Sequence, residues 1–148
     1  MEWVLLANLA STGFMVGLIW FVQVVHYPLF GAVGREGWTG YAAAHGRRTT
    51  RVVGPPMLVE LATAALLALR PPPGVPPAAA WAGLALVGVA WASTGLLQVP
   101  RHRVLAGGWD GAAHRSLVAG NWIRTAAWTL RGALVLWMLA RLLPGGAG

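Results

Sequence analysis

The chain has 148 residues, of which 57% are hydrophobic and 10% are charged, whereas about 25% of the residues in an average globular domain are charged. A chain of this length cannot bury so much apolar surface in its own core, so we expect the lipid bilayer to be its solvent and exclude disorder. The absence of cysteine excludes a disulfide scaffold, a thiolate metal site and a cysteine nucleophile. The net charge of +7 comes from eleven arginines spread along the chain, not gathered in one polar domain, so nucleic acid is not an expected partner.

Four segments are apolar enough to span a bilayer, which takes about 20 mostly apolar residues. They cover residues 4–25, 52–69, 78–99 and 122–143. The first has no basic segment before it and no small-residue cleavage site after it, so we interpret it as a retained span and not a signal peptide. We therefore predict an all-α fold: one membrane domain, residues 1–148, with four transmembrane helices arranged as two hairpins.

The arginines predict the orientation of these spans. The two longer connections, which we expect to be amphipathic and helical, hold seven of the eleven: Arg35, Arg47, Arg48, Arg51, Arg101, Arg103 and Arg115. Positive charge favours the cytoplasmic side, so both connections are predicted to be cytoplasmic and both termini outside. The proline-rich link at residues 71–74 is then a tight hairpin on the outer side.

The two halves of the chain resemble each other. Gln23 and His26 close the first predicted span, and Gln98 and His102 close the third, at offsets of 75 and 76 residues. A second pair, His45 and His114, follows at an offset of 69 residues. This pattern is consistent with a two-plus-two internal repeat, although two membrane hairpins can also look alike by chance.

Two ionisable residues are predicted to lie at similar depth in the membrane, where they are costly and are therefore candidates for function. Glu60 in the second span and Arg131 in the fourth are natural partners, with a bidentate fork as the strongest geometry. Asn121, Arg124, Trp128 and Arg131 are spaced three, four and three apart, on one helical stripe. We predict one polar pocket in the cytoplasmic half, floored by Glu60 and Arg131; a purely structural ion pair is the alternative.

Candidate roles follow from these positions. His26 lies at a span end and can move a proton near neutral pH, and Arg124 can bind an oxyanion, so these two are the predicted catalytic residues. The predicted substrate-binding residues are Gln23, Tyr27, Glu60, Gln98, Asn121, Trp128 and Arg131. We expect Pro28 and Pro100 to end spans one and three, and Pro55-Pro56 to lie in the first turn of span two.

The four histidines leave a second interpretation open. Imidazole is a ligand for zinc, copper and iron, so His26, His45, His102 and His114 could hold a metal ion or haem. No compact metal-binding signature accompanies them. The cofactor is therefore unknown, with none as the preferred prediction and haem or a metal ion as the alternative.

Short motifs resemble the anthrone-oxygenase-like family of small bacterial membrane proteins. They are Gly17-Leu18-Ile19-Trp20, Pro28-Leu29, Pro55-Pro56-Met57, the run from Gln98 to Ala106, and Asn121-Trp122-Ile123-Arg124-Thr125. Pro28, Pro100, Asn121 and Arg124 are the matching positions. The chain differs at His26, Glu60, Arg131 and at Arg101-His102, where an asparagine is common. The resemblance implies four helices in a bacterial plasma membrane and, for some members, oxidation of anthrones to anthraquinones without an evident cofactor.

The sequence thus predicts a membrane oxidoreductase, oxygenase-like, acting on a small hydrophobic and aromatic ligand that enters from the bilayer. One alternative is a haem- or metal-binding membrane module. Another is a small transporter or scaffold, which would need a homo-oligomer because four spans enclose little volume.

Overall fold

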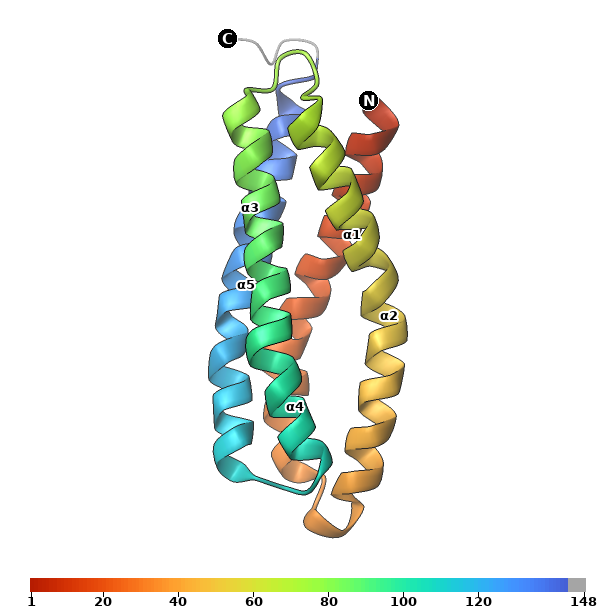
Figure 1. Cartoon of the computed structure of the whole chain (residues 1–148), viewed down its shortest axis with the longest axis vertical. Coiled ribbons are helices and arrows are strands. Elements are labelled where there is room, and N and C mark those ends of the chain that lie inside the picture. The colour runs from red at the N-terminus through yellow and green to blue at the C-terminus, as the bar shows by residue number, and fades with distance from the viewer. Residues whose placement is uncertain (144–148) are drawn as a thin grey trace.

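The computed structural model describes residues 1–143 of the chain, and these residues contain helices and no strand (Figure 1). The elements in chain order are α1 (Glu2–Phe21), the π-helix η1 (Val22–His26), the 3-10 helix η2 (Pro28–Ala32), α2 (Arg35–Leu69), α3 (Pro77–Ser93), the π-helix η3 (Thr94–Gln98), α4 (Val99–Ala106) and α5 (Gly111–Ala140). Since η1 continues α1, and η3 and α4 continue α3, the molecule is built from four long helical rods.

The four rods run antiparallel in a ring. α1 packs against α2 and α5, and α3 packs against the same two helices. α1 begins, α5 ends and the α2–α3 link turns at one end of the bundle, while the other two turns lie at the opposite end (Figure 1). At that opposite end the chain reverses before α2 at Gly34, whose φ of 82° is open to glycine and strained for other residues.

Three helical stretches are long and apolar enough to cross a membrane, namely Glu2–Ala32, Arg35–Leu69 and Pro77–Ala106. In each, only 28–33% of the most apolar window is buried inside the molecule, so most of those side chains face outward. Such a surface is typical of a protein in contact with lipid. The predicted fourth span lies in α5. This helix is less apolar than the other three stretches because Arg124 and Arg131 lie within its hydrophobic part.

The rods are longer than the spans predicted from the sequence. Most of the connection expected between spans one and two is the first half of α2, whose 35 residues extend over roughly 52 Å at 1.5 Å per residue. The connection expected between spans three and four is mostly α4 and the start of α5. α2 with 35 residues and α5 with 30 residues are therefore both longer than a hydrocarbon layer of about 30 Å.

The proline positions also differ from the prediction. Pro55 and Pro56 lie inside α2, not in its first turn, because the helix has already begun at Arg35. Pro100 does not end the third rod, since α4 continues to Ala106, whereas Pro28 does end the regular part of the first rod and starts η2. A proline inside a helix removes its own N–H donor and crowds the carbonyl four residues before it. Packing against neighbouring helices offsets these costs.

Candidate functional site

Glu60 lies at the centre of the first of two buried polar networks. Thr12 Oγ1 donates a hydrogen bond to its Oε1 at 2.7 Å, and Trp128 Nε1 donates to its Oε2 at 2.9 Å. α1 and α5 each supply one of these donors to a carboxylate on α2. The side chain is completely buried, and both of its oxygens have a partner, as a buried carboxylate requires.

Arg131 completes this first network. Its Nε lies 4.0 Å from Glu60 Oε1, and its Nη2 donates to Asn8 Oδ1 at 2.7 Å. The predicted pairing is present, but as a single long contact and not a bidentate fork. Gly83 on α3 leaves room for the guanidinium, since a Cβ at that position would overlap it.

The second network surrounds Arg124, which is 8% exposed. Its guanidinium donates twice to Asn121 Oδ1, with the Nε bond at 2.9 Å. Asn121 Nδ2 in turn donates to Gln23 Oε1 at 2.8 Å, and Gln23 Nε2 donates to the Val118 carbonyl at 3.2 Å. Gln23 and Asn121 therefore hold Arg124 in place from behind, which makes them supports of the site.

Tyr27 connects Arg124 to a histidine. Arg124 Nη2 donates to the Tyr27 hydroxyl at 3.1 Å, and that hydroxyl lies 2.9 Å from His102 Nε2. A guanidinium can only donate, so the Tyr27 oxygen accepts from Arg124 and its own proton is directed toward His102. Thr94 receives a longer bond of 3.4 Å from Arg124 Nη1.

The four histidines gather around one phenylalanine ring, Phe30. The centroids of their rings lie between 5.1 and 6.3 Å from that of Phe30. His26 Nε2 and His45 Nδ1 are 3.1 Å apart, and Thr49 Oγ1 is also 3.1 Å from His45 Nδ1. Within residues 1–143, however, no three His, Asp or Glu side chains are placed to hold a metal ion.

His45 lies seven residues before Val52, where the apolar part of α2 begins. Burial, and secondly the nearby His26, lower the pKa of His45 from 6.5 to about 4. His45 is therefore neutral at physiological pH, with one ring nitrogen that donates and one that accepts a hydrogen bond.

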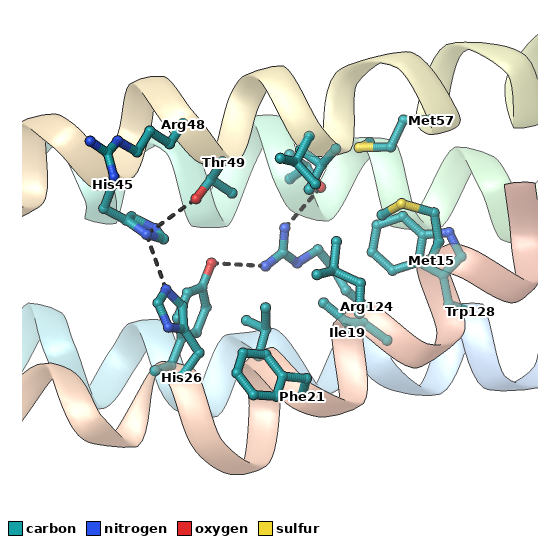
Figure 2. A pocket seen from close by; sticks show the side chains of 16 residues that line it. Met15, Ile19, Phe21, His26, His45, Arg48, Thr49, Met57, Arg124 and Trp128 are labelled. Carbon is teal, nitrogen blue, oxygen red and sulfur yellow. Dashed lines mark hydrogen bonds between the residues drawn. The ribbon is translucent and has the colours of Figure 1, made fainter.

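An apolar cavity of about 240 Å³ lies between α1 and α2. Figure 2 shows the Arg124 guanidinium reaching into it, between the His26–His45 pair on one side and Met15, Met57 and Trp128 on the other. The cavity is lined by Met15, Leu18, Ile19, Phe21, Val22, His26, Tyr27, His45, Arg48, Thr49, Val52, Val53, Met57, Thr94, Arg124 and Trp128. A pocket with mostly apolar walls and a few convergent polar groups is typical of a small-molecule site.

The structure brings some of the predicted site residues to this cavity and leaves others away from it. His26, Tyr27, Arg124 and Trp128 line it. Gln23 and Asn121 support Arg124 without lining the cavity, while Glu60 and Arg131 form their own closed network. Glu60 and Arg131, predicted to floor a polar pocket, do not line this cavity. Glu60 accepts from Thr12 and Trp128, and Arg131 donates to Asn8.

Gln98, a predicted substrate-binding residue, lies elsewhere. Its side chain is 1% exposed, and neither amide atom has a hydrogen-bond partner. It lies against α5 at Gly120, where an added Cβ would be 3.3 Å from its Nε2. Gln98 is thus a buried neighbour of the α3–α5 contact and does not reach the cavity.

Several lining residues carry no signal in the sequence. Thr94 lies in η3, where a π turn changes the direction of the side chains that follow it, and no sequence pattern marks that turn. Thr49 and Val53 lie in a segment expected to be a connection or the edge of a span. Met15 and Met57 look like ordinary span residues, and only their convergence from two helices marks them.

Comparison of the chain with protein-family models, with curated proteins and with solved structures finds no match. The site therefore has to be interpreted from its own geometry.

Proposed function

We propose that this protein is an integral-membrane oxidoreductase, oxygenase-like, that acts on a small hydrophobic, aromatic substrate bearing a carbonyl or phenolic oxygen. The observation that carries the proposal is Arg124, a buried cation directed into an apolar cavity beside Tyr27. A fixed positive charge in a water-poor site stabilises negative charge that develops on an oxygen. The apolar walls, including Trp128, suit an aromatic body.

The residues around the cavity fit a proton abstraction next to that oxygen. His26 takes a proton from a carbon adjacent to the oxygen-bearing ring system, and the charge left behind is delocalised onto the oxygen at Arg124. Dioxygen, the oxidant, then accepts the electrons: a CH₂ group and O₂ give a ketone and water. In this scheme Arg124 binds the oxygen, His26 is the base, and Tyr27, Gln23 and Asn121 position Arg124.

The membrane arrangement belongs to the same proposal. α5 would be the fourth span, with Arg124 and Arg131 turned inward at 8% and 2% exposure, so that neither charge meets lipid. The first half of α2 and the whole of α4, which carry six arginines between them, would lie in the cytoplasm of a bacterium, with both termini outside the plasma membrane. The π-helix at the end of both α1 and α3 favours a two-plus-two repeat.

The test uses the purified protein in lipid nanodiscs with anthrone as the probe, measuring quinone absorbance and oxygen uptake. His26→Ala and Arg124→Ala should each lower turnover by about 100-fold or more. The exposed Arg115 offers the matched control, because Arg115→Gln removes a positive charge far from the cavity. Turnover that survives Arg124→Ala, in a protein with an unchanged unfolding midpoint, would contradict the proposal.

A further inference from the structure

The cavity contains positive charge with nothing negative to balance it. Arg124 and Arg48 both line it, and none of its lining residues is acidic. The chain has four acidic residues, and all lie elsewhere. Glu60 is bonded to Thr12 and Trp128, Asp110 caps the start of α5, and Glu2 and Glu36 lie in the first turns of α1 and α2.

Arg131 provides an internal comparison. It lies seven residues after Arg124 on the same helix and is similarly buried, yet a carboxylate lies 4.0 Å from its Nε. Within residues 1–143 this is the one ion pair between side chains. Arg124 instead donates to three neutral oxygens, on Asn121, Tyr27 and Thr94. Neutral acceptors solvate a buried cation but do not cancel its charge, and an uncancelled charge is costly in an apolar environment.

We infer that the ligand of this cavity is an organic anion, with a carboxylate or phenolate oxygen on Arg124 and an apolar body of one to three rings against Met15, Met57 and Trp128. The inference rests on the proposed function, because it takes the same cavity as the ligand site and specifies the charge of the ligand. The cavity volume of about 240 Å³ is below the roughly 300–1,000 Å³ of pockets for drug-sized ligands, which sets the size of the body.

The rim of the cavity fits such a ligand. Phe21 on α1 and Val52 on α2 are both lining residues and both exposed, so they present apolar surface toward lipid at the opening. Arg48, also exposed, lies one helical turn before Val52. An amphiphile in the bilayer would keep its ring among the acyl chains while Arg48 attracts its anionic group at the membrane surface.

The test is isothermal titration calorimetry with the whole protein in phosphatidylcholine nanodiscs, with empty nanodiscs as the blank. The probes are 1-naphthoate, its neutral methyl ester and decanoate. We expect 1-naphthoate to bind at least tenfold more tightly than the ester and more tightly than decanoate. Arg124→Gln should lower the naphthoate affinity at least tenfold and leave the ester within twofold, and Arg115→Gln should change neither.

A second variant protects the test against misfolding. Arg124→Lys keeps the charge and should retain most of the preference for naphthoate over the ester. Equal affinities for naphthoate and ester would overturn the inference while leaving an aromatic-ligand cavity in place. Tighter binding of decanoate than of 1-naphthoate would overturn the inference that the apolar part of the ligand is a ring system. Failure of both naphthalene probes to bind the wild-type protein would overturn the ligand cavity of the proposed function as well.

Discussion

Arg124 and Arg131 lie on the same face of α5, yet their surroundings give them different roles. Arg131 contacts Glu60 and Asn8 in a closed network that joins α1, α2 and α5. Arg124 is held by Asn121 and Tyr27 with its guanidinium directed at a cavity. A charge that is already neutralised stabilises a fold or sets its register, whereas one without a counter-charge is available to a ligand.

Gly83→Ala should destabilise the protein by about 1–3 kcal/mol, the usual cost of overpacking. The added methyl group would overlap the Arg131 guanidinium, which cannot move aside without losing its bond to Asn8. Thermal unfolding in detergent measures the effect.

Gly88→Ala provides the control, because it lies in the same helix and an added Cβ has nothing within 4 Å. It should leave the unfolding temperature unchanged or raise it, since alanine favours a helix more than glycine does. Equal unfolding temperatures for the two variants would show that the close approach of Gly83 to the Arg131 guanidinium does not contribute to stability.

Stability should fall as the pH is lowered from about 6.5 to about 4, in part because of His45. Its pKa is about 4 in the folded protein, against the ordinary histidine value of 6.5, so the unfolded chain binds the proton first and acid favours unfolding. The groups that face its ring are His26, His102 and Tyr41. Unfolding temperatures of the wild type and His45→Gln measured from pH 7.5 to 4.5 should show a shallower decline for the variant, and parallel curves would contradict this assignment.

At the scale of the helical elements, the π-helix η1 decides which way the site residues point. Its bond from the Tyr27 N–H to the Val22 carbonyl, 2.9 Å long, spans five residues instead of four. The extra residue offsets everything after it by about 100° relative to a continuous α-helix, which has 3.6 residues per turn. His26 and Tyr27 reach the cavity from this register.

Inserting one alanine after Val24, which is exposed, should rotate Tyr27 by about 100° around the helix axis and away from Arg124. We expect unchanged helix content by circular dichroism and at least a tenfold loss of naphthoate affinity. Val24→Ala keeps the residue count and should bind like the wild type. Wild-type binding by the insertion variant would contradict the idea that the register of η1 positions Tyr27.

At the scale of the whole molecule, three helical stretches are long and apolar enough to cross a membrane. Most residues in the most apolar segment of each stretch are exposed. Such a surface is unfavourable in water and favourable in lipid. Tryptophans with exposed indole rings lie near the ends of the helices, with Trp3 at 82% and Trp81 at 53% exposure, and such residues favour the membrane interface.

The natural absence of cysteine allows a direct test of the proposed topology. Single cysteines at the exposed positions Glu36, Ala112 and Pro73 would be labelled with a membrane-impermeant maleimide in intact and permeabilised cells. We expect Pro73→Cys to react in intact cells, and Glu36→Cys and Ala112→Cys only after permeabilisation. Labelling of all three from the same side would contradict a four-span bundle.

Composition and spacing alone determined the helical class of this protein, its apolar stretches and the inward stripe of α5. These follow from hydrophobic content and helical periodicity, which are local properties of a chain. The Glu60–Arg131 pairing was also predictable, because two opposite charges at one depth in apolar surroundings have few other partners.

Only the tertiary structure decided where the cavity lies and which residues it contains. A π turn changes the register of a helix without a signal that a single sequence shows, so the positions of His26, Tyr27 and Thr94 relative to Arg124 could not be derived. Thr12 and Trp128 each donate to one oxygen of Glu60 and Arg131 approaches only Oε1, an arrangement that packing between three helices sets. The site depends on contacts between residues far apart in the chain, and spacing along one helix does not contain them.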